Sequence, residues 1–316
     1  MASLKNIKLK ILSYQKTGTV THAMEAVSAV KMRKSQERAL SGRAYAAAGL
    51  SILERLSGTV YAPHHPLMQE MSFRDPKGDP STPKTCVIVV TSDKGLAGAL
   101  NSGVIRLVER ETHERGWRKS EVMFVGIGRR GAEYFANRGY EVRARYENVS
   151  DGVSEEYIRK VTDNVLAWHA AGEVDTVYVA YQNFISTFEQ QPTLRQIVPI
   201  KPDMMRAIVE NIRPVRGKYV PLETAERQAS PATYTIEPDA NSVLAALLPK
   251  LLNIAVFHAL LEAKASEHSA RMVAMKSATD KAKEMAQGLT RTFNKVRQAA
   301  ITREVSEITS GIEAMR

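Results

Sequence analysis

Three glycines have a spacing that is typical of dinucleotide-binding proteins. In the segment VGIGRRG, Gly126, Gly128 and Gly131 follow a predicted strand and precede a predicted helix. Glycines in this GxGxxG pattern let a pyrophosphate approach the N-terminus of the helix. The pattern also needs an acidic residue about 20 positions later at a strand end, whereas Glu147 and Asp151 both lie in a loop-like stretch. A tight strand-to-helix turn therefore explains these glycines better than a cofactor site.

A second glycine-containing turn, TSDKGLAGAL, follows the first predicted strand of the same region. It combines Asp93, Lys94, Gly95 and Gly98 with a helix, as phosphate-binding loops do. The lysine precedes the glycines, however, and no Ser or Thr follows it as the P-loop pattern requires. We interpret the segment as a turn at a strand end where only small residues fit.

The other reactive side chains form no recognisable catalytic or metal-binding pattern. The seven histidines are scattered without metal-ligand spacing, and no Ser/His/Asp or Cys/His set is present. The only cysteine, Cys86, begins an apolar segment and excludes an internal disulfide framework. We therefore expect no catalytic residue, no metal, no cofactor and no direct small-molecule substrate.

The charge of the chain favours anionic partners. There are 44 Lys and Arg against 34 Asp and Glu, which gives a net charge of +10. No set of aromatic, Arg or Asn residues is placed to read bases, so the charge alone is weak evidence for nucleic-acid binding. We expect no nucleic-acid partner, but a coiled-coil nucleic-acid or scaffold protein stays an alternative, as does a dinucleotide-binding oxidoreductase with helical oligomerisation arms.

The proline content and the hydrophobic pattern of the sequence change four times along its 316 residues. Prolines are concentrated in two segments, and between these segments short apolar runs alternate with amphipathic helical patterns, which predicts a mostly parallel α/β sheet. The predicted parts are an N-terminal coiled-coil helix at 1–58, a linker at 59–84, an α/β domain at 85–200, an irregular connection at 201–237 and a C-terminal coiled-coil helix at 238–316.

Two rows of residues repeat every seven positions in the C-terminal segment, the pattern of a left-handed coiled coil. The first row is Ile254, Leu261, His268, Met275, Ala282, Leu289 and Val296, and the second is His258, Ala265, Met272, Thr279, Ala286, Phe293 and Ala300. The apolar pattern then shifts to Ile301, Val305, Ile308 and Ile312. Because the only other long helix is at the opposite end of the chain, we expect the two to pair antiparallel. This pairing brings Ile7, Ile11 and Tyr14 against Leu289, Phe293 and Val296, and part of the longer helix projects alone.

The longest apolar stretch, Val243 to Leu261, is a poor membrane span. It contains Pro249, Lys250 and His258, and a lysine in mid-bilayer costs about 2.5–3.5 kcal/mol. The segment MASLKNIKLK has neither the apolar core of a signal peptide nor the composition of a transit peptide. We expect a soluble or peripheral protein without a targeting peptide.

The chain resembles the gamma chains of F-type ATP synthases, the central rotor stalk. The resemblance lies in MASLKNIKLKI and THAMEAVSAVKMRKSQERA near the start, and in TSDKGLAGALN in the middle. It continues in ALLEAKASEHSARMVAMKSATDKAKEM and FNKVRQAAITREVSEITSG near the end. The last stretch is similar to the family signature, although Ile312 stands where the family usually has Ala.

The resemblance implies a Rossmann-like α/β domain, without nucleotide, inserted between two long terminal helices that form an antiparallel coiled coil. It implies a non-catalytic subunit that couples proton flow to ATP synthesis by rotation. The implied partners are the alpha and beta subunits of the catalytic ring, the epsilon subunit and the membrane c-ring, and the location is the cytoplasmic side of the cell inner membrane. We further expect a rotor tip without a large apolar patch, which would adhere to one ring subunit.

Residues that the helix pair does not need are the candidates for contact with those subunits. Polar groups where the heptad rows give way to the shifted pattern, and residues beside small side chains in the N-terminal helix, fit this description. The resulting candidate coupling residues are Met24, Arg271, Arg297, Gln298, Thr302 and Glu304.

Overall fold

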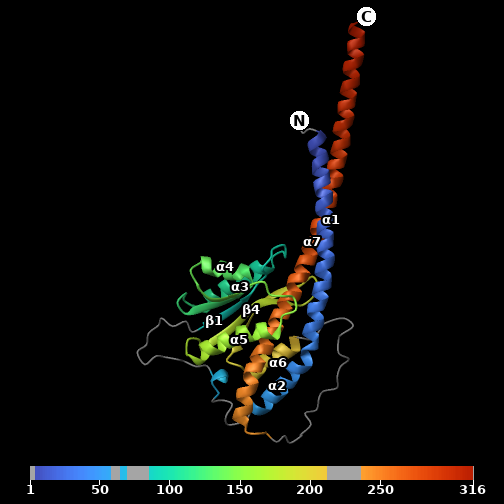
Figure 1. Cartoon of the computed structure of the whole chain (residues 1–316). Helices are drawn as coiled ribbons and strands as arrows, with labels where there is room; N and C mark the ends of the chain where they lie inside the picture. Colours follow the sequence, from blue (N-terminus) through green and yellow to red (C-terminus); the bar gives the residue numbers. More distant parts are fainter. Residues whose placement is uncertain (1–3, 58–64, 70–84, 212–235, 316) are drawn as a thin grey trace. The chain divides into compact units, whose positions relative to one another are not determined.

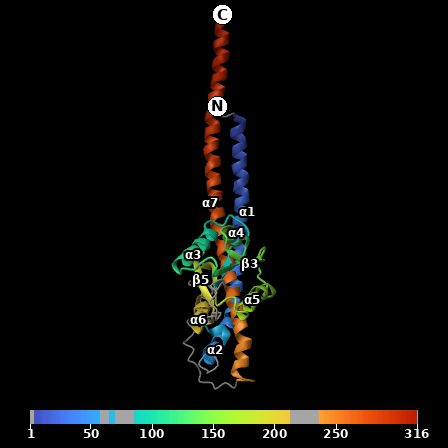
Figure 2. The same ribbon diagram turned by 90° about the vertical axis from the view of Figure 1, so that its left-hand side faces the viewer.

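The structure is a computed structural model that describes residues 4–57, 65–69, 85–211 and 236–315 (Figure 1). The chain divides into two compact units, one of residues 1–29 with 271–316 and a larger one of residues 30–270. Two terminal helices, α1 (Leu4–Ser41) and α7 (Ala240–Ala314), contribute residues to both units. The two views in Figures 1 and 2 show α1 and α7 running side by side.

The larger unit contains a five-stranded sheet in the order β3-β2-β1-β4-β5. The first four strands in this order are parallel, and β5 is antiparallel to β4. Connections of helical length between parallel strands produce this α/β arrangement. The strands are β1 (Thr85–Val90), β2 (Val122–Ile127), β3 (Glu141–Tyr146), β4 (Thr176–Phe184) and β5 (Gln190–Val198).

Each face of the sheet has its own hydrophobic core, because alternate residues of a strand point to opposite faces. In β1, Ile88 and Val90 pack on one face, and Val87 and Val89 pack on the other. The core that includes Val87 is covered by α3 (Leu100–Glu114) and α4 (Arg129–Asn137).

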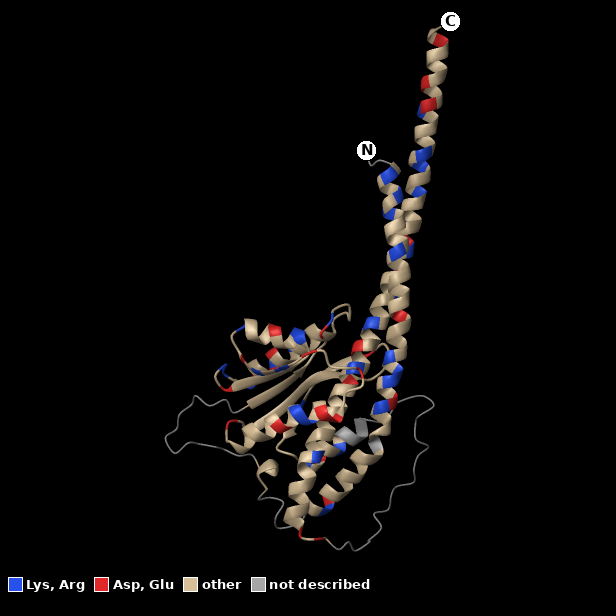
Figure 3. Cartoon of the chain, in the orientation of Figure 1, with Lys and Arg blue, Asp and Glu red and all other residues tan. Residues whose placement is uncertain are grey.

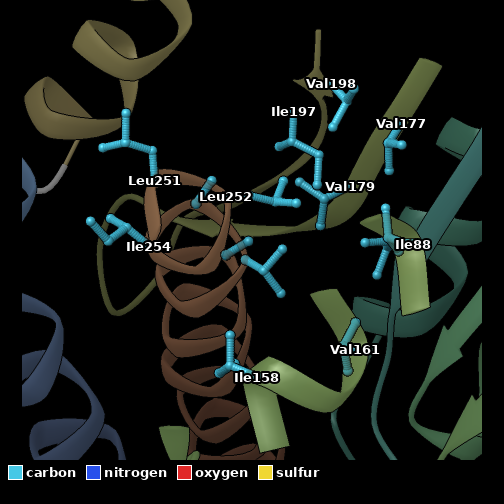
Figure 4. Packing of buried hydrophobic residues seen from close by; sticks show 14 of the residues in the cluster. Ile88, Ile158, Val161, Val177, Val179, Ile197, Val198, Leu251, Leu252 and Ile254 are labelled. Carbon is cyan, nitrogen blue, oxygen red and sulfur yellow. The ribbon is translucent and has the colours of Figure 1, made fainter. Parts of the chain in front are cut away.

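The other face of the sheet packs against α5 (Glu155–Ala170) and the first part of α7. Figure 4 shows Leu252 of α7 beside strand residues such as Val179. The apolar face of α5 faces this core, since Val161 and Val165 are fully buried. Ser154 caps this helix by accepting a hydrogen bond from the Tyr157 backbone.

The predicted N-terminal helix is divided in the structure. Helix α1 ends at Ser41, and α2 (Arg43–Ser57) begins after Gly42. Gly42 lies against the ring of His258, and a Cβ at Gly49 would come within 2.8 Å of Leu251. Small residues thus allow α2 to approach α7 closely.

The pairing within the larger unit is antiparallel. In an antiparallel pair of helices, the numbers of two residues that face each other have a constant sum. Gly42 faces His258 and Gly49 faces Leu251, and both sums are 300. The pairing of the smaller unit has the same register, because Gly18 packs on Ala282 and the Thr21 and Thr279 hydroxyls are 2.6 Å apart. The expected antiparallel coiled coil beside an inserted α/β domain is confirmed.

Two predicted irregular segments contain regular structure. Residues 202–211 form helix α6 (Pro202–Asn211), because Pro202 suits a first helical turn and Arg206 bonds Glu54 of α2. Within the predicted linker, Pro66–Met68 forms a short 3₁₀ helix whose Leu67 is buried. The rest of the predicted linker and of the 201–237 connection lies largely outside the described residues.

Helix α7 contains a stretch that is long and apolar enough to span a membrane, with a mean hydropathy of 1.9. Within the chain, 56% of that stretch is buried. More than half of this apolar stretch thus packs against the rest of the protein, as in the core helix of a globular protein. Pro249 lies inside this continuous helix, near its beginning.

Candidate subunit-contact surface

In the glycine turn after β2, backbone N–H groups that could bind a phosphate already donate to side chains of the same chain. The backbone N–H of Gly131 donates to Thr91 Oγ1 at 2.9 Å, and that of Arg129 donates to Asp93 Oδ1 at 3.1 Å. These are donors at the N-terminus of α4, where a dinucleotide pyrophosphate would have to bind. Asp93 also places a carboxylate there. The geometry therefore disfavours the oxidoreductase alternative.

The glycines of this turn serve close packing. Gly128 has a φ of +88°, and a Cβ on it would come within 1.9 Å of the Thr91 carbonyl oxygen. A Cβ on Gly126 would come within 2.4 Å of Ala132. The interpretation of VGIGRRG as a tight strand-to-helix turn is supported by these contacts.

Cys86 and His258 are buried. Burial raises the pKa of the Cys86 thiol to about 12, so the thiol is unreactive. Burial lowers the pKa of His258 to about 4, and Arg195 contributes in the same direction. Among the described residues, no group of three or more His, Cys, Asp or Glu could hold a metal ion.

The seam of the smaller unit follows the two predicted rows. Between residues 275 and 300, the side chains that are buried or half-buried are those of the rows together with Ala278, and all others are exposed. Continuing the register of Gly18 and Ala282 places Ile7 opposite Phe293 and Ile11 opposite Leu289. The predicted pairing of Ile7 and Ile11 with Phe293 and Leu289 agrees with this register, whereas Tyr14 lies opposite Ala286 rather than Val296.

Four of the six candidate coupling residues are exposed on α7: Arg297, Gln298, Thr302 and Glu304. Met24 on α1 is half-buried. Arg271 differs from the others because it is only 9% exposed, so its guanidinium is not freely available to another subunit. The side chains of Met24 and Arg271 thus have surroundings that the heptad pattern did not reveal.

The last turns of α7 carry an exposed apolar row. Ile301, Val305, Ile308 and Ile312 are between 52% and 63% exposed. The register places Leu4, where α1 begins, opposite Val296, so the row comes after the part of α7 that pairs with α1. This row departs from the expectation of a tip without apolar surface.

The paired part of the smaller unit is strongly basic. Residues 1–29 and 271–300 contain eleven Lys and Arg against three Asp and Glu, which gives +8 of the chain's net +10. Figure 3 shows the basic residues recurring along both helices, with acidic residues close to the C-terminus. The surface therefore combines a basic shaft with an apolar last segment.

Two polar residues of the larger unit escaped the sequence reasoning. Asp151, which was considered only as a cofactor ligand, bonds Lys31 of α1 and His268 of α7. Glu262 lies buried on α7, and its Oε2 has no hydrogen-bond partner among the described residues. The partners of Asp151 are too distant along the chain for any local spacing to reveal them.

Comparison with known proteins identifies the family. The sequence model described as ATP synthase matches residues 3–315. The "ATP synthase gamma chain" of Pelotomaculum thermopropionicum is 36% identical over 315 residues, and that of Cupriavidus necator is 38% identical over 315 residues. In both comparisons the match covers 100% of each chain.

Solved structures share the fold. A chain of the Euglena gracilis mitochondrial ATP synthase, in a structure of "OSCP/F1/c-ring, rotational state 3", has a TM-score of 0.61 at 17% identity. The match covers 99% of this chain and 94% of that one. A chain of the Tetrahymena thermophila "central stalk/cring" structure has a TM-score of 0.56 at 23% identity, with 82% and 99% covered. The chain described here belongs to the family of ATP synthase gamma chains.

Proposed function

We propose that this chain is the rotating central stalk of a proton-translocating ATP synthase and that it has no catalytic site of its own. The observation that carries the proposal is the exposed apolar row from Ile301 to Ile312, which follows the paired part of α7. A row of this kind on a single helix marks a protein interaction site. A ring of subunits around the helix would cover it from every side.

The proposed partners are the alpha and beta subunits of the catalytic ring around α7, and the epsilon subunit and the c-ring at the other end. The names of the Tetrahymena and Euglena structures, which mention a central stalk with a c-ring and F1 with a c-ring, support this set of partners. As a part of the F1 portion of the synthase this chain is peripheral to a membrane, and we propose that it lies on the cytoplasmic side of the bacterial inner membrane.

The basic shaft suits rotation inside such a ring. Exposed charge pairs contribute only about 0–1 kcal/mol each, so acidic loops of the ring would attract the shaft without holding it at one angle. Each orientation would favour one conformation of each surrounding subunit through its own set of contacts, and differential contact is what shifts a population. Arg297, Gln298, Thr302, Glu304 and Met24 are the residues we propose for these contacts.

Arg271 has a different role in this proposal. Because it is buried to about nine tenths, we place it among the residues that shape α7 rather than among those that touch the ring.

Reconstitution tests the proposal. Alpha and beta subunits of the same source are assembled with this chain or with a version truncated after Ala300, and steady-state ATP hydrolysis is measured. The full chain should support rapid turnover, and the truncated chain should support markedly less. Equal turnover with both chains, or ATP hydrolysis by the isolated chain, would contradict the proposal.

A further inference from the structure

The loop between β3 and α5, residues 147–154, reaches both terminal helices through a single side chain. Asp151 Oδ2 accepts from Lys31 Nζ of α1 at 2.8 Å. Asp151 Oδ1 lies 2.8 Å from His268 Nε2 of α7. Three elements that are far apart in the sequence therefore meet at one carboxylate.

The loop is fixed on both sides of this carboxylate. Val149 and Val153 are both buried in the core beneath the sheet. Val153 has a φ of +36°, an unfavourable conformation for a β-branched residue, and its N–H donates to the Ser150 carbonyl at 3.1 Å. Strain of this kind persists only where the surroundings hold the backbone in place, so Asp151 is presented from a rigid support.

A second contact joins the same loop to α1. A Cβ added to Gly152 would come within 2.6 Å of Arg38 Nη1. The loop backbone therefore passes closely over α1 near Arg38, about two helical turns from Lys31. Contact at two levels of one helix resists both sliding and rotation of that helix against the loop.

The exposure of the three side chains shows how the junction is built. The side chain of His268 is 4% exposed, whereas those of Asp151 and Lys31 are 37% and 47% exposed. An ion pair this accessible contributes little to folding stability. Its role is to position α1 and α7, because both helices contact the same carboxylate of the β3–α5 loop.

Asp151 is charged at every physiological pH. Partial burial acts to raise the pKa of Asp151, but hydrogen bonds from Lys31 and His268 outweigh it and lower the pKa to about 2. The stabilisation is therefore complete above the unfolded value of about 3.9 and is lost only as the pH falls toward 2. Protonation of Asp151 therefore does not break these contacts at physiological pH.

We propose that Asp151 is a positioning residue that fastens the β3–α5 loop to α1 and α7 together, so that a turning force on the α/β layer reaches both helices. The transmission of force rests on the proposed rotary function. The attachment of the loop to the two helices is a property of the chain alone and does not depend on that function. Without the carboxylate, the loop would hold α1 only by packing near Arg38 and would lose its bond to α7.

The attachment of the loop to the two helices is tested by double electron–electron resonance, which measures the distance between two spin labels, on the full chain. Spin labels are placed at Lys34 on α1 and Glu156 on α5, both exposed, and the buried Cys86 is replaced by Ala. We expect one narrow distance in the parent chain, loss of that narrow distance in Asp151→Asn, and its return in Asp151→Glu. Asp163→Asn, which removes an exposed carboxylate from α5, should leave the distance narrow.

The consequence is tested in membrane vesicles that contain the complete synthase. Asp151→Asn should keep ATP hydrolysis near the wild-type rate but lower the number of protons pumped per ATP. An unchanged distance distribution in Asp151→Asn would overturn the fastening. A broadened distribution with unchanged pumping per ATP would overturn the transmission of force. Failure of the unmutated chain to support pumping would instead refute the proposed function, and the distance measurement would be unaffected by it.

Discussion

Helix α7 has two very different parts. From Leu251 to Ala270, in the larger unit, every side chain is buried or half-buried. From Met275 to Ala300, in the smaller unit, only the heptad rows and Ala278 are buried or half-buried, and the remaining side chains face solvent. One continuous helix thus serves as a core element in one unit and as half of a two-stranded shaft in the other.

The polar residues of the two parts differ accordingly. In the first part, the polar side chains are buried or half-buried, and some have specific partners, as when Ser266 donates to the Gln182 carbonyl at 3.0 Å. In the second part, most polar side chains are exposed, with a buried threonine pair as an exception. The first part is specialised for holding one structure, and the second leaves its outer surface available to other proteins.

Truncation of one leucine in each part should give the largest difference. Leu251 is fully buried, and Leu251→Ala should lower the free energy of unfolding by about 3 kcal/mol. Leu289 is half-buried, and Leu289→Ala should cost only about 1 kcal/mol. Urea denaturation followed by circular dichroism measures both values. Equal losses would remove the distinction between core and shaft.

The buried acid of the first part should make stability depend on pH. Burial raises the pKa of Glu262 from 4.5 to about 7, although Arg195 and Tyr181 act in the opposite direction. A raised carboxyl pKa means that the native state binds the proton more tightly, so the free energy of unfolding falls as the pH rises from about 4.5 to about 7. Glu262→Gln, which imitates the neutral acid, should be more stable than wild type by up to about 3 kcal/mol at pH 8 and by little at pH 4.

Urea denaturation at a series of pH values measures this difference. Glu284, exposed on the shaft, provides the control, because Glu284→Gln should shift stability by the same small amount at both pH values. A Glu262→Gln variant whose advantage does not grow with pH would show that Glu262 is ionised in the folded protein.

A buried pair of hydroxyls should give a smaller effect in the shaft. The Thr21 and Thr279 hydroxyl oxygens are 2.6 Å apart across the seam, so one hydroxyl donates to the other, and the accepting hydroxyl donates to a carbonyl in its own helix. Thr21→Val alone should destabilise by about 1 kcal/mol, because it leaves the partner hydroxyl with one bond fewer. The double change to Val should cost less than the sum of the single changes, and thermal denaturation of all four proteins measures the coupling. Strictly additive losses would mean that the two hydroxyls do not interact.

The smallest effect on stability is expected at the exposed end of the pairing. Replacing Arg297 and Gln298 with Ala should change the free energy of unfolding by less than about 0.5 kcal/mol, because both side chains are exposed. In vesicles containing the complete synthase, the same change should lower ATP turnover or the protons pumped per ATP. Met24→Lys should lower the number of protons pumped per ATP hydrolysed, because the added positive charge would bind an acidic loop of the ring. Wild-type rates and pumping ratios in both variants would mark these residues as ordinary surface.

Much of the fold followed from local patterns in the sequence. The heptad rows predicted which residues of α7 are buried, because a helix that pairs along its length repeats its contacts every two turns. The alternation of apolar runs with amphipathic helices predicted the sheet. Each of these signals is contained within a few turns of one element.

What the sequence did not reveal depends on contacts between distant segments. Helix α6 was read as irregular because prolines surround it, although Pro202 lies where a helix tolerates proline. The division of the N-terminal helix at Gly42 rests on packing against His258. Asp151 is paired with residues more than a hundred positions away, and no spacing rule connects them.

Observation of single molecules tests the central claim most directly. The catalytic ring is fixed to a surface, a probe is attached to a cysteine introduced at the exposed Tyr45 on α2, and ATP is added. The account predicts that the probe turns continuously in one direction, with the exposed row of α7 inside the ring. A ring that hydrolyses ATP at the normal rate while the probe stays at a fixed angle would contradict it.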